Sequence, residues 1–297
     1  MNKQYIVAGH RFELRMADDS AVWAHLSNYE PFEASDGGKP LFTLELVDAS
    51  AMLKPDKEVV YNTPAEEPDQ PRMEIYRNRA ESRFKWVFEM APVQKMNICV
   101  RMLCTEDFAE AQVAVADVNR LGAFGINNSM MLLYAFTTAP YDTLEMHSSV
   151  TRKDGKGYMF LGKSGTGKST HSSLWLKYIP GSDLMNDDNP IIRIVDGVAR
   201  VYGSPWSGKT PCYKNTDAPI GAIVKLNQYK ENRIHRCQAL EAYSIIFPSC
   251  SGLRSIERIA DGLHATIEKL ALEVPCFVLD CLPDEEAAQL CHKTVRS

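Results

Sequence analysis

One stretch constrains this chain more than any other. Gly162–Thr170 reads Gly-Lys-Ser-Gly-Thr-Gly-Lys-Ser-Thr and matches the pattern G-x-x-x-x-G-K-[ST] in full. A short apolar run, Gly157–Leu161, comes before it and predicts a buried strand, and the residues Lys168–Tyr178 after it are tolerated in a helix. A strand, a glycine loop and a helix in this order form a site in which backbone N–H groups surround a phosphate group.

The motif predicts a site for a nucleoside triphosphate. Its glycines permit backbone conformations that other residues avoid, so that successive N–H groups can point at one anion. Lys168 can reach the terminal phosphates, and the Ser169 hydroxyl can hold Mg²⁺. We therefore expect ATP and Mg²⁺ as the cofactors, with the nucleotide bound by Gly162, Lys163, Ser164, Gly165, Thr166, Gly167, Lys168, Ser169 and Thr170.

A pair of carboxylates, Asp187-Asp188, follows Lys168 after one helix and a turn. An enzyme that uses a nucleoside triphosphate needs a carboxylate near the γ-phosphate, to hold the metal or to take a proton from the nucleophile. Neighbouring residues on a strand point to opposite faces, so one aspartate could serve the metal while the other acts as the base. The alternative is a solvated Asp-Asp-Asn turn before Pro190.

These residues carry a resemblance to a known family. Gly162–Thr170, Leu184–Asp188 and His147 together resemble the C-terminal domain of HPr kinase/phosphorylase and, more distantly, ATP-dependent phosphoenolpyruvate carboxykinase. In HPr kinase a histidine stands at much the same place, on the strands that lead into the phosphate loop. The resemblance implies a mixed-sheet nucleotide-binding core and the transfer of a phosphoryl group to a hydroxyl.

The resemblance also implies roles for single residues. It makes Asp187, the first of the pair, the general base, which leaves Asp188 to hold the metal with Ser169. Lys168 would stabilise the transferred group, and His147 would either assist catalysis or be a satisfied core histidine. The likeness is incomplete, because Asp188–Tyr229 lacks the glutamate that serves as a metal ligand in HPr kinase. The arginine-rich signature linked with phosphorolysis is also not recognisable, so the reverse, dephosphorylating reaction is not predicted.

The segment Gly203–Thr210 stands where that signature would be. Lys209 could neutralise charge on the transferred phosphoryl group, and Trp206 could form a wall of the acceptor pocket. An ordinary loop with one exposed lysine is an equally good interpretation of this segment.

The pattern of strands and helices predicts an α/β fold with two parts. Residues 1–120 are expected to form a β-rich, mostly antiparallel lobe, interrupted by a proline-rich surface loop over Asp48–Pro71. Residues 121–297 are expected to form a mixed-sheet core of the HPr kinase/carboxykinase type, with a hairpin around Asp196-Gly197. Helices are predicted over Glu106–Arg120, Phe124–Phe136, Ala239–Phe247, Ser255–Leu272 and Asp284–Val295.

Composition limits the partners. A formal charge of −5 argues against nucleic acid, which demands clustered cations. No apolar run approaches the ~20 residues that span a bilayer, and no secretion signal is visible near Met1, so we expect a cytoplasmic protein without a membrane partner. The 8 cysteines show no C-x-x-C spacing of the zinc-binding kind. Association into a homo-oligomer is left open.

The sequence thus predicts a kinase that uses ATP and Mg²⁺ to phosphorylate a hydroxyl, on a serine of a protein or peptide or on a small molecule. Two alternatives remain: a non-catalytic module that binds or senses ATP, and a lyase similar to phosphoenolpyruvate carboxykinase. The acceptor cannot be named, because specificity resides in loops whose sequences follow no code.

Overall fold

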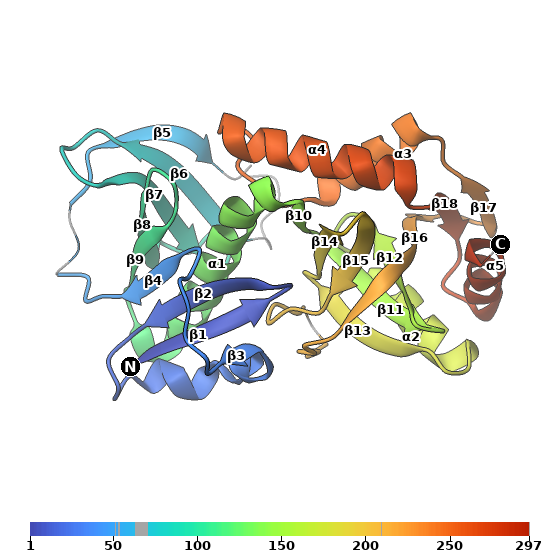
Figure 1. The fold of residues 1–297 in the computed structure, drawn as a ribbon, viewed down its shortest axis with the longest axis horizontal. Coiled ribbons are helices and arrows are strands. Elements are labelled where there is room, and N and C mark those ends of the chain that lie inside the picture. The colour runs from blue at the N-terminus through green and yellow to red at the C-terminus, as the bar shows by residue number, and fades with distance from the viewer. Residues whose placement is uncertain (51, 53, 63–70, 209, 297) are drawn as a thin grey trace. The chain divides into compact units, whose positions relative to one another are not determined.

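The computed structural model describes residues 1–50, 52, 54–62, 71–208 and 210–296. The chain divides into two compact units, Met1–Thr137 and Thr138–Ser297, which are described separately (Figure 1). The boundary expected at residue 120 falls inside helix α1 (Val118–Thr138), which carries the first unit past that point. Each unit contains a mixed sheet together with helices, which confirms the α/β fold class.

In the first unit, the residues that the structure describes form a nine-stranded sheet in the order β3-β1-β2-β4-β9-β8-β7-β6-β5. Strands β2, β4 and β9 pair in parallel, and the other neighbours are antiparallel. The strands are β1 (Asn2–Val7), β2 (His10–Arg15), β3 (Glu33–Ala34), β4 (Thr43–Leu46), β5 (Lys57–Asn62), β6 (Arg72–Asn78), β7 (Phe84–Ala91), β8 (Val100–Thr105) and β9 (Glu110–Val115).

Helix α1 packs on this sheet through aromatic side chains. The Phe12 ring stacks on Phe42 with centroids 5.2 Å apart and meets Tyr134 of α1 edge to face at 5.8 Å. The Tyr134 hydroxyl donates a hydrogen bond to the Val7 carbonyl at 2.9 Å, which satisfies the one polar group of a fully buried ring.

Two sequence predictions for this unit are wrong. The helix expected over Glu106–Arg120 is instead strand β9 followed by the start of α1. Strand β9 lies between β4 and β8 and is buried over most of its length. Its alanines and valines therefore pack within a sheet and not along the apolar face of a helix. The surface loop expected over Asp48–Pro71 contains the edge strand β5, whose six residues are all exposed.

The sheet of the second unit follows the path β10-β14-β15-β16-β12-β11-β13, with β18 beside β16 and β17 beside β18. Strands β12, β16 and β18 run parallel. The strands are β10 (Thr143–Glu145), β11 (Ser148–Lys153), β12 (Lys156–Leu161), β13 (Asp183–Asp188), β14 (Ile191–Val195), β15 (Val198–Tyr202), β16 (Asp217–Gln228), β17 (Arg233–Arg236) and β18 (Cys276–Cys281). Asp196 and Gly197, both with positive φ, join β14 to β15 and confirm the predicted hairpin.

Among the described residues of this unit, four α-helices complete the fold: α2 (Lys168–Tyr178), α3 (Ala239–Ile246), α4 (Glu257–Glu273) and α5 (Glu285–Val295). Helices α2 and α5 cover one apolar area of the sheet around the fully buried Trp175, whose ring lies 5.4 Å from Phe160 and 5.3 Å from His292. Helices α3 and α4 pack against each other (Figure 1). Within the part of the chain that the structure describes, no helix is long and apolar enough to cross a bilayer.

Candidate functional site

The segment Gly162–Thr170, called here the 162–170 loop, joins the end of β12 to the start of α2. Strand β12 is buried at the residues that lead into the loop, which fixes where the loop begins. Gly165 and Gly167 have φ of 78° and 106°, a region that residues with a Cβ rarely adopt. The loop therefore has the strand, turn and helix N-terminus that the sequence predicts.

Lys168, His147 and Asp188 form a chain of contacts across this loop. The Lys168 ammonium group lies 2.8 Å from Nε2 of His147 and donates to the Gly162 carbonyl at 2.9 Å. Nδ1 of His147 lies 2.9 Å from Oδ1 of Asp188. The partners favour a neutral imidazole that accepts from the ammonium group and donates to the carboxylate.

Burial sets the electrostatics of the lysine. Lys168 is 9 % exposed, and burial lowers the pKa of its ammonium group, while the negative charges of Asp188 and Asp187 oppose that shift. The ammonium group thus lies at the mouth of the loop, hydrogen-bonded to His147 and to the carbonyls of Gly162 and Lys163, in the field of the two carboxylates. An anion that entered the loop would meet a positive charge with little water around it.

The second carboxylate contacts the next residue of the motif. The Ser169 hydroxyl donates to Oδ1 of Asp187 at 2.9 Å, and Asp187 is only 3 % exposed. The adjacent aspartates thus make different contacts, Asp187 with Ser169 and Asp188 with His147, as the alternation of a strand predicts. Asp188 has a φ of 143°, a region that costs a non-glycine residue about 1–3 kcal/mol and that is often found at functional sites.

The segment Gly203–Gly208 lies against this aspartate pair. Gly208 donates its N–H to the Asp187 carbonyl at 2.5 Å, and the Ser207 hydroxyl donates to the same oxygen at 3.1 Å. Trp206 is 4 % exposed, so most of its ring is enclosed by protein. Lys209, the other residue predicted to meet the acceptor, lies outside the described residues. The predicted substrate roles of Trp206 and Lys209 stay predictions.

A cavity of about 530 Å³ opens beside the loop. Its walls are mainly apolar side chains, and its polar groups include Gln228, which donates to the Gly165 carbonyl at 3.2 Å. Burial lowers the pKa of the His171 imidazole at the cavity wall to about 4, so this ring is neutral at pH 7. The lining residues are Gly165, Thr166, Gly167, Thr170, His171, Leu174, Leu226, Gln228, Tyr229, Cys281, Leu282 and Pro283.

A buried acid lies behind the site and was not expected from the sequence. Glu145, at the end of β10, is 1 % exposed; its Oε1 accepts from the Ser251 hydroxyl at 3.3 Å, and its Oε2 has no hydrogen-bond partner among the described residues. Burial, together with the negative charge of Asp188 and despite the bond from Ser251, raises the pKa of this carboxyl to about 8. At pH 7 this acid is therefore mostly neutral, within electrostatic range of the Asp188 carboxylate.

The structure thus brings together the predicted residues Lys168, Ser169, Asp187, Asp188 and His147. The sequence did not reveal the cavity, because its walls come from β16, α2 and the segment after β18, which are far apart along the chain. The only local signal was that apolar strands end next to polar or aromatic residues, as at Gln228 and Tyr229, and this pattern is too common to identify a site.

Comparison with known proteins adds little to this geometry. No protein-family model matches the chain, and no curated protein matches its sequence. Among solved structures, the Hpr(Ser) kinase/phosphatase from Coxiella burnetii is similar over 51 % of this chain and 93 % of its own, with 12 % identity and a TM-score of 0.31. This is a distant structural likeness that shows neither a family nor an activity, so a function has to come from the residues of the site.

Proposed function

We propose that this protein is a kinase that uses ATP and Mg²⁺ to transfer the γ-phosphoryl group to a hydroxyl, on a serine side chain or on a small-molecule alcohol. One observation carries the proposal. The serine and the lysine of the 162–170 loop are linked to different members of the aspartate pair. Ser169 contacts Asp187 directly, and Lys168 is linked to Asp188 through His147. Phosphoryl transfer needs a cation, a metal site and a proton acceptor around one phosphate group.

The donor nucleotide would occupy the loop and the cavity beside it. The N–H groups of the loop and the N-terminus of α2 favour an anion, and Lys168 supplies a charge that can neutralise the terminal phosphates. The cavity of about 530 Å³ is of the size that small-molecule sites have, and its apolar walls suit a nucleobase. His171, neutral at pH 7, adds no charge to that wall.

The metal would be held by Ser169 and Asp187. Their oxygens lie 2.9 Å apart at the start of α2, and hydroxyl and carboxylate oxygens are the donors that Mg²⁺ prefers. When bound, Mg²⁺ supplies charge neutralisation at the β- and γ-phosphates. This arrangement exchanges the roles that the sequence assigned to Asp187 and Asp188, because in the structure Asp187 and not Asp188 contacts the loop serine.

Asp188 would then accept the proton. Its side chain is 34 % exposed, which leaves room for an acceptor, and His147 fixes one of its oxygens through the 2.9 Å contact. The hydroxyl proton passes to Asp188, the hydroxyl oxygen bonds to the γ-phosphorus, and the bond from that phosphorus to the β–γ bridging oxygen breaks to release ADP. His147 and Lys168 keep the carboxylate and the phosphoryl group in place during this step.

Nucleotide binding is tested first. A ligand that binds only the folded state at about 100 times its Kd stabilises the protein by about 2.7 kcal/mol, so MgATP should raise the Tm. Lys168→Ala should abolish most of that shift. Lys156→Ala, at the exposed opposite end of β12, is the matched control and should keep it. No shift for the wild-type protein at millimolar MgATP would refute the nucleotide site.

The roles of the aspartates are tested by phosphoryl transfer, measured as ADP release with serine peptides and small alcohols as acceptors. Asp188→Asn should retain MgATP binding and lose about 10²–10⁴-fold in turnover, as expected for a lost general base. Asp187→Asn should instead raise the Mg²⁺ concentration needed for half-maximal rate. The reverse pattern would restore the assignment made from the sequence, and MgATP binding without any transfer would point to a sensing module.

A further inference from the structure

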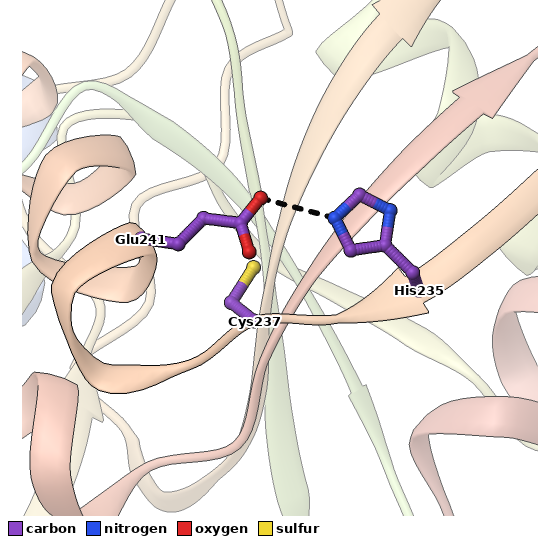
Figure 2. A group of neighbouring side chains, drawn as sticks. All are labelled: His235, Cys237 and Glu241. Carbon is purple, nitrogen blue, oxygen red and sulfur yellow. Dashed lines mark hydrogen bonds and ion pairs between the residues drawn. The ribbon is translucent and has the colours of Figure 1, made fainter.

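A second cluster of reactive side chains lies outside the nucleotide site. His235 is on β17, Cys237 follows the end of that strand, and Glu241 is in the first turn of α3. The period of two in an extended chain places His235 and Cys237 on the same side. The imidazole nitrogen, the sulfur and a carboxylate oxygen all lie within 4.8 Å of one another, and Figure 2 shows the three side chains meeting at one point.

We propose that His235, Cys237 and Glu241 form a binding site for a divalent cation of the zinc class. Nitrogen, sulfur and carboxylate oxygen are the donors that Zn²⁺ takes in proteins. Tetrahedral bonds of about 2.0–2.3 Å place neighbouring ligand atoms about 3.3–3.7 Å apart. Nε2 of His235 and Oε1 of Glu241 are already 3.0 Å apart, so the cluster needs only a small adjustment to enclose an ion.

The surroundings leave a place for a further ligand. Cys237 is 9 % exposed, whereas the side chains of His235 and Glu241 are half exposed, so water reaches the cluster from the side of His235 and Glu241. A cavity of about 360 Å³ reaches Cys237 between α3 and the end of α4. Three protein ligands and one open position are typical of zinc sites that bind water or another small ligand.

Charge also favours a divalent ion. With an ion bound, the cysteine would be a thiolate; a thiolate and a carboxylate carry two negative charges and a neutral imidazole adds none, so a divalent cation would make the group neutral. The alternative is an ordinary surface ion pair between His235 and Glu241, which would contribute little and would not need the buried sulfur beside it.

The cluster is separate from the nucleotide site within the second unit. The Cys237 N–H donates to the Cys276 carbonyl at 2.8 Å, so Cys237 lies at the amino end of β18. Strand β18 is parallel to β16, and β16 to β12, whose carboxyl end begins the 162–170 loop. The two sites therefore lie at opposite ends of these parallel strands, and the proposed cation site is independent of the kinase proposal.

Titration of the chelator-treated full chain with Co²⁺ tests the proposal. One equivalent of Co²⁺ should give the ligand-field bands of a tetrahedral ion together with a thiolate-to-cobalt charge-transfer band, and Zn²⁺ should displace it. Saturating Mg²⁺ should leave these bands unchanged, because Mg²⁺ prefers oxygen donors. A chain that binds no stoichiometric Co²⁺, or binds it without the charge-transfer band, would overturn the site.

Variants identify the ligands. Cys237→Ser should abolish the charge-transfer band, whereas Cys276→Ser, the same change at the residue directly across the strand pair, should keep it. His235→Ala and Glu241→Gln alter exposed side chains. Each should weaken the affinity for Co²⁺ by more than roughly 10–100-fold, which is the loss expected when a residue that only supports a metal ligand is removed. A band that survives Cys237→Ser, or affinities within twofold of wild type for His235→Ala and Glu241→Gln, would refute the assignment.

Discussion

The buried acid behind the proposed site gives a prediction with a definite size and sign. The carboxyl pKa of Glu145 is raised from 4.5 to about 8, chiefly because the side chain is buried, so the folded protein binds this proton more tightly than the unfolded chain. Between those two pKa values the unfolded chain loses the proton first. Stability therefore falls as pH rises from about 4.5 to about 8, and beyond that range this group adds no further slope.

The magnitude follows from the linkage between proton binding and folding. One pKa unit corresponds to about 1.36 kcal/mol, so raising the pH from 5 to 8 should cost the wild-type protein about 3 kcal/mol through this residue alone. Glu145→Gln removes the titration and keeps the shape and a group that can accept from the Ser251 hydroxyl. The free energy of unfolding of Glu145→Gln relative to wild type should therefore rise by about 3 kcal/mol across that range.

Urea unfolding at pH 5, 6, 7 and 8, without nucleotide or Mg²⁺, measures this difference. Replacing Trp23 and Trp86 by Phe in both proteins leaves Trp175 and Trp206, so that fluorescence reports the unit that contains Glu145. Glu268→Gln, a change of the same charge at an exposed position of α4, is the matched control and should show no pH-dependent difference. A Glu145→Gln difference that stays flat from pH 5 to pH 8 would refute the argument.

Three further changes test the packing of the same unit. Gly167→Ala should destabilise the protein by about 1–2 kcal/mol and weaken MgATP binding, because the φ of 106° is unfavourable for alanine; urea unfolding measures the first effect and calorimetric titration the second. Tyr229→Ala, at the cavity wall, should weaken the binding of ATP but leave the binding of tripolyphosphate unchanged. An equal loss of affinity for both ligands would argue against a nucleoside in the cavity. Trp175→Ala should cost about 3–5 kcal/mol in urea unfolding, because the ring is fully buried, and a cost below 1 kcal/mol would contradict its central place in the core.

The sequence predicted local elements well where the chain itself determines them. The 162–170 loop is set by its own glycines, and the turn at Asp196-Gly197 is set by two residues that accept positive φ. Neither element needs distant parts of the chain to fix its conformation.

The errors have the opposite cause. Strand β9 is a strand because β4 and β8 lie on either side of it, and nothing within residues 106–120 announces those neighbours. Strand β5 is exposed along its whole length, so it lacks the alternation of apolar residues by which a half-buried strand is recognised. For a similar reason, the sequence did not reveal the cluster of His235, Cys237 and Glu241. A search for paired cysteines cannot find three different ligand types that come from a strand and a helix.

The register between β11 and β13 explains why the two aspartates reach different partners. Ser149 pairs with Asp187 and Ser148 with Asp188, and an irregularity further along skips Met185, so that Val150 faces Asn186 and Thr151 faces Leu184. In a ladder with a period of two, a shift by one residue would turn each aspartate to the opposite face. The irregularity lies beyond the pairs of the two aspartates, so the register at the acidic end of β13 is intact, and it keeps Asp187 at Ser169 and Asp188 at His147.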